Sequence, residues 1–282
     1  MNFSLIFDNI RLEEKLILKA AQDRNYKVNM VSVNSMNMDF DSSLGDSYGR
    51  ITLQRSTSYY RGLHSTAYLE YKGQKVVNDL QIQLIAGNKM FTSLALMKNG
   101  VPTPRTSVST SREVALEQFS GKFGESAVLK PVTGSWGRIL ALMNDRAAAM
   151  AVLEDREYMY PLYSIFYMQE YVKRPPRDIR AFVVGDRVIG GIYRYEAPGD
   201  WRTNTAISGR AEKCKIEGEL EDIVLKAAKS IGYGIFGVDV MESEKGYTVH
   251  EVNSTTEFKN TVRVGQVDVP GEILNFLEEE AR

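Results

Sequence analysis

The residues that could do chemistry gather near the end of the chain, in two short apolar runs. Asp239 interrupts the first run, and Glu251 and Asn253 interrupt the second. Both runs are typical of strands, and residues two apart on a strand point to the same face, so Glu251 and Asn253 share one face. Carboxylate and amide oxygens are hard ligands that suit Mg²⁺ held jointly with phosphate oxygens. The spacing therefore predicts a metal site for phosphate chemistry on two neighbouring strands.

Two lysines stand where a phosphate would be a natural partner. Lys130 ends an apolar strand just before a glycine-bearing loop, and Lys89 opens a helix, where the helix dipole disfavours a cation. The loop consists of Gly134, Ser135, Trp136, Gly137 and Arg138. Its backbone N–H groups could cradle phosphates, although it is neither a Walker A motif nor a Rossmann fingerprint. A solvated lysine is the alternative interpretation at both positions.

A second group of charges lies upstream of the acidic cluster. Asp178 and Arg180 alternate along one strand and share a face, and Arg194 ends the next strand. Two arginines on adjacent strands could clamp a phosphate or carboxylate, the alternative being an ordinary cross-strand ion pair of Arg180. Asn204, in the polar loop 201–206, is a candidate contact to a phosphate or to the metal shell.

Two further segments could bind ligands. Backbone groups of residues 169–172 could bind an adenine, although a half-buried strand is the more economical interpretation. The polar segment 257–261 leaves the metal site and is a candidate substrate contact, with a surface loop as the alternative. His250 precedes Glu251 on the strand, so we expect it on the opposite face in a structural role.

Composition excludes several classes of protein. The 282 residues include 35 basic and 36 acidic ones, so bulk charge supports neither nucleic-acid nor membrane-surface binding. The single cysteine, Cys214, permits no intramolecular disulfide, and no His/Cys spacing suggests zinc. No apolar run approaches the roughly 18 residues of a membrane helix, and the first residues lack a signal-peptide pattern. We therefore expect a cytoplasmic protein.

Alternating strands and helices favour an α/β or α+β fold in three blocks. In the first block we expect strands at 3–7, 27–33 and 76–78 and helices at 12–24 and 80–85. In the second we expect helices at 89–98, 112–119 and 145–153 and a strand at 127–132, with a capping box of Thr110 and Glu113 opening the middle helix. In the third we expect strands at 166–172, 179–184 and 188–194, the latter two joined by a tight turn at Gly185, and helices at 219–230 and from Pro270.

These motifs occur in the order found in ATP-grasp ligases, and the resemblance covers nearly the whole chain. It is closest to the branch that contains the ribosomal protein S6 glutamate ligases, and within it to the LysX family, which joins α-aminoadipate to the amino-group carrier protein LysW. The glycine-bearing loop and the ending 257–261 carry this finer resemblance. The resemblance implies an ATP-grasp fold with an N-terminal pre-grasp α/β domain (1–87), a central lid domain (88–165) and a C-terminal grasp domain with the metal site (166–282).

The resemblance also implies roles for individual residues. By this resemblance, the residues that contact the phosphates, adenine and ribose of ATP are Lys89, Lys130, Gly134, Ser135, Trp136, Gly137, Arg138, Gln169, Glu170, Tyr171, Val172, Asp178 and Asn204. Mg²⁺ falls to Asp239, Glu251 and Asn253, and the catalytic residues are Arg180, Arg194 and Asn204. Substrate contacts fall to Arg194, Thr203, Asn204, Glu257, Phe258, Lys259, Asn260 and Thr261.

The chemistry that the resemblance implies is activation of a carboxylate by ATP to an acyl phosphate, followed by attack of an amine. The partners would be a small acidic LysW-like carrier and free α-aminoadipate, in lysine biosynthesis, and we expect a homo-oligomer, a dimer or tetramer. Asn260 and Thr261 favour α-aminoadipate, since Gly-Phe stands there in the glutamate-specific ArgX branch of arginine biosynthesis. A dual-substrate enzyme, or a glutamate ligase acting on ribosomal-protein tails or peptides, stays an alternative. The stretch 204–209 lacks the Arg-Gly-Gly ending of the LysX pattern. If that arginine contacts the carboxylate of the amino acid, Arg194 or Arg263 would have to replace it here.

Overall fold

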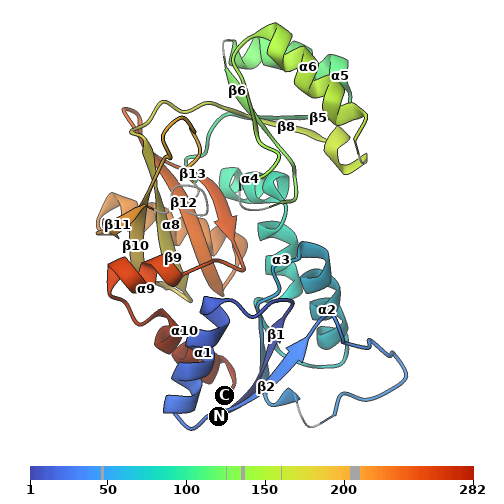
Figure 1. Cartoon of the computed structure of the whole chain (residues 1–282), viewed down its shortest axis with the longest axis vertical. Coiled ribbons are helices and arrows are strands. Elements are labelled where there is room, and N and C mark those ends of the chain that lie inside the picture. The colour runs from blue at the N-terminus through green and yellow to red at the C-terminus, as the bar shows by residue number, and fades with distance from the viewer. Residues whose placement is uncertain (46–47, 125, 135–136, 160, 204–209) are drawn as a thin grey trace.

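Three β-sheets organise the computed structural model, which describes all residues except 46–47, 125, 135–136, 160 and 204–209 (Figure 1). The first sheet is parallel, in the order β2-β1-β3-β4. Its elements are β1 (Asn2–Phe7), α1 (Leu12–Asp23), β2 (Lys27–Ser32), β3 (Ile51–Gln54), α2 (Tyr59–Tyr71), β4 (Val76–Val77) and α3 (Leu80–Ala86). The strands and helices expected in this block are confirmed, while β3 and α2 were not predicted.

The second sheet is antiparallel, in the order β5-β8-β6-β7. Its elements are β5 (Thr106–Ser109), α5 (Arg112–Gln118), β6 (Ala127–Lys130), β7 (Ala141–Met143), α6 (Arg146–Glu157) and β8 (Phe166–Glu170). We call this sheet with α5 and α6 the lid. Its core of Ala115, Phe119, Leu129, Leu153 and Met168 lies between the sheet and the two helices.

Two predictions about the lid are wrong. The strand β8 was placed in the third block, but it pairs with β5 and β6, because its apolar face completes the lid core. The expected capping box at Thr110 is also wrong. Ser111 is the N-cap of α5, and its hydroxyl accepts from the Val114 N–H, so the cap lies one residue later.

The third sheet, which we call the grasp sheet, has the order β11-β10-β9-β12-β13. Its elements are β9 (Arg177–Val184), β10 (Arg187–Tyr195), β11 (Ala211–Cys214), α8 (Glu219–Ile231), β12 (Ile235–Ser243), β13 (Gly246–Asn253), α9 (Lys259–Gly265) and α10 (Val269–Glu280). The hairpin turn at Gly185, where φ is 60°, and the helix from Pro270 are confirmed. The helix α4 (Lys89–Lys98) was assigned to the lid block, but Leu96 packs with Val224 and Val249 in the core beneath the grasp sheet.

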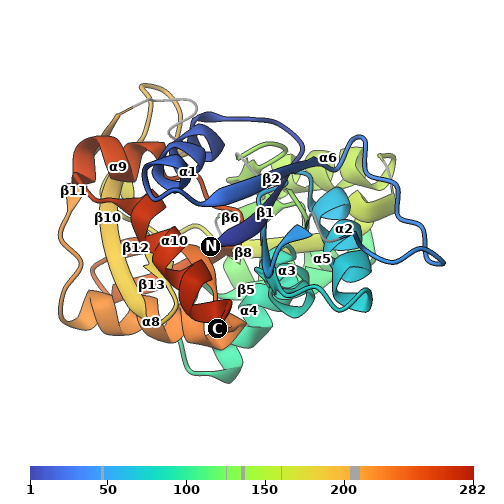
Figure 2. The ribbon, with the colours of Figure 1, turned by 90° about the horizontal axis from the view of Figure 1, so that it is seen from below.

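The first sheet and the grasp sheet share one hydrophobic core. Figure 2, seen from below, shows α1 and α10 side by side. Phe3, Leu5 and Ile17 of the N-terminal block lie in the same cluster as Phe182 and Ile273. Consequently the N-terminal block is fixed to the grasp sheet by apolar packing, while the lid has a core of its own. In the part of the chain that is described, no helix has the length and apolarity to cross a membrane.

The independent lid core makes its packing testable. Replacing Leu153, which is fully buried on α6, by alanine leaves a cavity and should lower the free energy of unfolding of the lid by about 2–5 kcal/mol. Urea denaturation followed by hydrogen exchange in α5 and α6 measures this. Met150→Ala on the same helix is the control, because Met150 is 52 % exposed and should change stability by less than about 0.5 kcal/mol. Equal effects of both changes would contradict the assignment.

Candidate active site

A cleft of about 300 Å³ is lined by residues from the N-terminal block, the lid and the grasp sheet. Figure 1 shows the lid strands β6 and β8 on one side of the molecule and the N-terminal helices α2 and α3 on the other. Cations outnumber carboxylates in the lining. The lining cations are Arg11, Lys89, Lys130, Arg138, Arg174, Arg180, Arg194 and Arg202, and the lining carboxylates are Glu170, Asp178, Asp239, Glu251 and Glu257. The excess of positive charge suits an anionic ligand such as a nucleotide.

At the centre of the cleft, Asp239 on β12 lies directly opposite Glu251 on β13 and opposite Arg180 on β9. The Arg180 guanidinium donates two hydrogen bonds of 2.6 Å to Asp239, and Arg194 Nη2 lies 3.0 Å from Asp239 Oδ2. Arg194 also binds Asp178 through two bonds of 2.6 and 2.7 Å. The predicted gathering of these side chains is confirmed. In the structure the two arginines hold carboxylates of the protein, which is the cross-strand pairing considered as the alternative.

The buried charges stabilise one another. Burial raises the pKa of Asp178, but the charge of Arg194, aided by His250, outweighs it and holds that pKa well below its usual range. Burial likewise lowers the pKa of Arg194, but Asp178 and Asp239 raise it beyond its ordinary value. Asp178 and Arg194 therefore stay ionised as a buried pair.

A β-bulge changes where His250 points. Asp239 pairs with Glu251, but the next pair along the ladder is Val240 with Val249, so His250 is an extra residue in β13. The prediction that His250 faces away from Glu251 is therefore wrong. His250 lines the cleft together with Glu251, and its Nε2 lies 3.7 Å from Asp178. Burial lowers the pKa of His250, so the ring is neutral near pH 7.

Two lysines flank Glu251. Lys89 Nζ lies 3.3 Å from Glu251 Oε1 and donates to the Gly134 carbonyl at 2.8 Å, so these two acceptors balance the cation at the start of α4. Lys130 is buried and donates to Gln169 Oε1 at 2.6 Å. Burial raises the pKa of Glu251, but the charges of Lys89 and Lys130 outweigh it and lower the pKa to about 2. The carboxylate is thus charged at any physiological pH.

The oxygen donors fit a Mg²⁺ ion. A carboxylate offers about four lone-pair positions, and the three contacts from Arg180 and Arg194 leave one of those of Asp239 available. Asn253 lines the cleft beside these carboxylates and can offer its amide oxygen as a further ligand. Within the described residues, no three His, Cys, Asp or Glu side chains form a metal site on their own. Asp239, Glu251 and Asn253 would therefore share the ion with phosphate oxygens.

The lid contributes the segment 169–172 to the cleft. Apolar side chains of Val128, Leu140 and Met241 line the same cleft and suit a planar base. Glu170 is held by Arg105, whose backbone N–H and Nε donate to it at 2.9 and 2.7 Å. Burial raises the pKa of Glu170, but these bonds outweigh it and keep the pKa below its usual value.

The glycine-bearing loop reaches the cleft from the lid. Gly134 and Gly137 have φ angles of 143° and 64°, which favour glycine, and both line the cleft with Arg138. Arg202 Nη1 donates to the Gly137 carbonyl at 3.0 Å and so joins the loop to residues 200–203. Ser135, Trp136 and Asn204, all predicted to bind ligand, lie outside the described residues.

The predicted substrate residues divide into two groups. Glu257 and Thr203 line the cleft, and the Thr203 hydroxyl donates to Asp178 at 2.6 Å. Phe258 and Thr261 are fully buried, so the prediction that they contact substrate is wrong, because Phe258 packs on Phe182 in the shared core. The segment is also not a continuous loop. Its last three residues, Lys259, Asn260 and Thr261, begin α9, and none of them lines the cleft.

Several cleft residues escaped sequence reasoning. Arg11 and residues 56–58 enter from the N-terminal block, and Arg174 and Arg202 enter from loops of the grasp sheet. No local sequence motif identifies these residues, because each is a polar residue in a segment whose composition is typical of a surface loop. Of the two arginines considered as replacements for the missing Arg-Gly-Gly, Arg194 lines the cleft, whereas Arg263 is exposed on α9 and does not.

Comparison with known proteins places this arrangement in a family. Residues 86–277 match the model of the RimK-like ATP-grasp domain, and residues 3–85 match that of the LysX preATP-grasp domain. This chain belongs to the RimK-like ATP-grasp family. A solved RimK domain ATP-grasp protein from Sphaerobacter thermophilus has the same fold, with a TM-score of 0.78 over 99 % of this chain and 100 % of that one at 22 % identity.

Two relatives come from Sulfolobus acidocaldarius. The α-aminoadipate–LysW ligase LysX is 39 % identical, over 96 % of this chain and 99 % of its own length. The glutamate–LysW ligase ArgX is 31 % identical, over 99 % of this chain and 98 % of its own length. The expected ATP-grasp fold and the expected family are confirmed.

Lys130 gives nucleotide binding a predictable pH dependence. Burial lowers the pKa of Lys130 to about 8, with Glu251 opposing the shift, so the ammonium form is lost as pH rises through about 8. A phosphate binds the ammonium form, and we expect the Kd of a non-hydrolysable ATP analogue to weaken by up to about tenfold per pH unit above 8. Calorimetry between pH 7 and 9.5 measures this.

The control is Lys130→Arg, whose guanidinium stays charged throughout this range. Its Kd should vary far less with pH than that of the wild type. The same pH dependence in both proteins would remove Lys130 from the phosphate-binding set.

Proposed function

We propose that this protein is an ATP-dependent carboxylate–amine ligase that joins the α-amino group of α-aminoadipate to the side-chain carboxylate of the C-terminal glutamate of a LysW-like carrier protein. The observation that carries the proposal is the cleft itself, where Asp239 and Glu251 face one another among Lys89, Lys130 and the paired arginines. Membership of the RimK-like ATP-grasp family and the LysX relatives support it. Lysine biosynthesis is the corresponding process.

The reaction has two steps. A carboxylate oxygen of the carrier glutamate attacks the γ-phosphorus of ATP, the bond to the bridging oxygen breaks, and ADP leaves. The amine nitrogen then attacks the acyl carbon of the acyl phosphate, phosphate departs with the bonding electrons, and the nitrogen loses a proton to solvent. Both steps depend mainly on positioning and charge neutralisation, so no protein nucleophile is needed. Cys214 agrees with this, because it is buried in the grasp core and burial raises the pKa of its thiol.

The residues of the cleft can be given roles in this reaction. Lys89 and Lys130 would hold phosphate oxygens beside Gly134 and Gly137, and residues 169–172 would hold the adenine and ribose. Asp239, Glu251 and Asn253 would hold Mg²⁺, which when bound neutralises phosphate charge. Arg180 and Arg194 orient Asp239, and both line the cleft in which the phosphorylated intermediate would form.

Glutamate is the second candidate acceptor amino acid. The ArgX relative matches this chain over nearly its full length, although at lower identity than LysX. One methylene separates the two amino acids, and a contact of that size discriminates by only about 1–3 kcal/mol. Mass spectrometry of the carrier after incubation with ATP, Mg²⁺ and each amino acid tests the proposal. A carrier whose mass does not change with either amino acid would refute it.

The metal assignment predicts a selective loss of activity. Glu251→Gln keeps the shape of the side chain but removes the charge that would hold Mg²⁺, so kcat should fall at least about 100-fold. The matched control is Glu242→Gln on the adjacent strand, because Glu242 pairs with Arg177 outside the cleft. It should stay within about twofold of wild type. If Glu251→Gln keeps the wild-type turnover in Mg²⁺, Glu251 is not a ligand of the metal.

The specificity motif predicts a shift in preference. Replacing Asn260 and Thr261 by Gly and Phe should move the ratio of kcat/KM for α-aminoadipate and glutamate toward glutamate, by about tenfold. Since neither residue lines the cleft, the effect would reach substrate through the start of α9. Thermal denaturation of the same variant is the control, because Thr261 is fully buried beside Gly190. A well-folded variant with an unchanged ratio would exclude the motif from specificity.

A further inference from the structure

The segment 254–259, which joins β13 to the first residue of α9, directly follows the proposed metal ligand Asn253. Residues 254–257 line the cleft, as do Arg11 and residues 56–58 of the N-terminal block. This end of the cleft is formed by the N-terminal block and the grasp sheet, whereas Lys130 and residues 169–172 belong to the lid. The segment therefore borders the part of the cleft away from the proposed nucleotide site.

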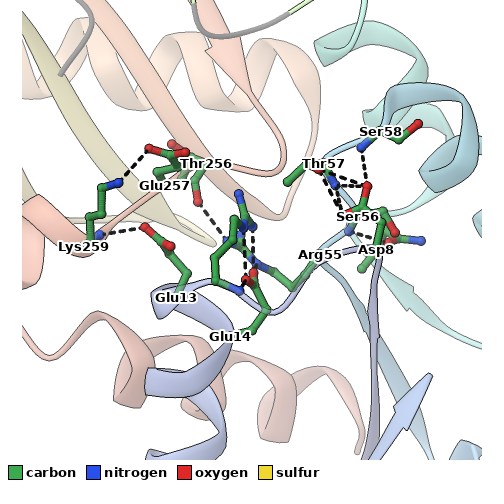
Figure 3. A network of polar contacts seen from close by, with 12 residues as sticks. Asp8, Glu13, Glu14, Arg55, Ser56, Thr57, Ser58, Thr256, Glu257 and Lys259 are labelled. Atoms are coloured by element: carbon green, nitrogen blue, oxygen red, sulfur yellow. Dashed lines mark hydrogen bonds and ion pairs between the residues drawn. The ribbon is translucent and has the colours of Figure 1, made fainter. Parts of the chain in front are cut away.

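Three side chains of the N-terminal block hold the backbone of this segment. Asn78 Nδ2 donates to the Ser254 carbonyl at 2.8 Å, and Arg55 Nη2 donates to the Thr256 carbonyl at 3.1 Å. Glu13 Oε1 accepts from the Lys259 N–H at 3.1 Å. Figure 3 shows the contact of Arg55 with Thr256 and that of Glu13 with Lys259.

Each of these three side chains is almost fully buried, with relative exposures of 1 to 3 %. Arg55 is the largest of them, and its Nε donates to Glu14 at 3.1 Å while its guanidinium lies 5.6 Å from the centre of the Phe258 ring. Burying an ion pair rarely stabilises a fold more than apolar residues of similar volume would. The Arg55 guanidinium joins the Glu14 carboxylate to the Thr256 carbonyl. We therefore attribute its burial to a role in fixing the position of the segment rather than to a gain in stability.

The opposite side of the segment is equally constrained. A Cβ on Gly237 of β12 would collide with the Thr256 hydroxyl, and one on Gly234 would collide with the Asn78 side chain. Asn78 is itself fixed by Ile235, to which it donates at 2.7 Å and from which it accepts at 2.8 Å. The segment is thus held between β12 and the N-terminal block with little freedom to shift.

We propose that Asn78, Arg55 and Glu13 are positioning residues for the amine acceptor, acting by fixing the 254–259 segment at the acceptor end of the cleft. The inference rests on the proposed function, because it concerns the amino acid that attacks the acyl phosphate. In this proposal the N-terminal block positions the amine for its attack on the acyl phosphate, while the lid and the grasp sheet bind the groups that take part in phosphorylation. A misplacement of about 1 Å can lower a reaction rate about 100-fold. Three contacts that fix the backbone of the segment can therefore have a large effect on the reaction with the amine.

The two half-reactions can be measured separately on the full chain. Hydroxylamine traps the acyl phosphate of the carrier as a hydroxamate, without any amino-acid acceptor. In Arg55→Lys, a single ammonium replaces the planar fork that joins Glu14 to Thr256. We expect the KM for α-aminoadipate to rise at least about tenfold, which corresponds to about 1.4 kcal/mol, and hydroxamate formation to stay within about twofold. Glu13→Ala should act in the same direction and keeps the test valid if the first variant folds poorly.

Arg24→Ala is the matched control. Arg24 also joins α1 to the grasp domain, donating to Asn275 at 2.7 Å and to the Gly271 carbonyl at 3.2 Å, but it does not line the cleft. In Arg24→Ala, the rate of hydroxamate formation and the KM for α-aminoadipate should both stay at the wild-type level. An equal fall of hydroxamate formation and transfer in Arg55→Lys and Glu13→Ala, or an unchanged KM for the amino acid, would overturn the proposal.

A readout that needs no substrate separates this inference from the proposed function. Amide hydrogen exchange in residues 254–260 should be faster in Arg55→Lys and Glu13→Ala than in the wild type or in Arg24→Ala. Unchanged exchange would overturn the positioning role even if ligation is observed. Conversely, a wild-type protein that modifies no carrier would overturn the proposed function, while faster exchange in the two variants would still support the clamp on the segment.

Discussion

The site depends on one buried charge network, in which Asp239 lies between Arg180 and Arg194. Strand register creates it, because Arg180, Asp239 and Glu251 are direct neighbours on β9, β12 and β13. Asp178 completes the network by holding Arg194 from the other side. Removing one partner of such a buried pair typically costs about 3–5 kcal/mol, so each charge requires the others. The network orients Asp239, and the register of β12 and β13 brings Glu251 and Asn253 beside it without a flexible loop.

A second constraint is the unequal attachment of the three parts of the molecule. The N-terminal block shares a hydrophobic core with the grasp sheet, whereas the lid packs around its own core. Apolar burial of this kind makes the N-terminal block and the grasp sheet a rigid support for the acidic centre. Lys130 and residues 169–172 belong to the part with a separate core. The cleft is thus lined both by the lid and by the N-terminal block with the grasp sheet, which have separate cores. This arrangement suits a reaction in which one substrate stays bound while a second one enters.

Local sequence signals predicted much of the fold, and their failures have identifiable physical causes. The amphipathic helix α8 and the strands β9, β10, β12 and β13 were found because their apolar periodicity is local, whereas the short strand β11 was not predicted. The strand β8 was misplaced because its pattern cannot say which sheet it joins, and that choice follows from packing with Phe119 and Leu153. His250 was placed on the wrong face because a bulge, which depends on the partner strand, breaks the alternation. Phe258 was taken as a ligand contact, although its ring fills the core shared with the N-terminal block.

The sequence alone determined the family, through motifs in a fixed order, and indicated candidate oxygen ligands on two strands and cations before a glycine-bearing loop. Each of these motifs can be recognised without a structure because it lies within a few residues. The tertiary structure alone decided which charges pair and which residues support the segment after the metal ligands. Arg55 and Thr256 are 201 positions apart, and Glu13 and Lys259 are 246 apart. No periodicity links such residues, because their contact exists only once two blocks bury a common core and leave these polar groups to satisfy one another.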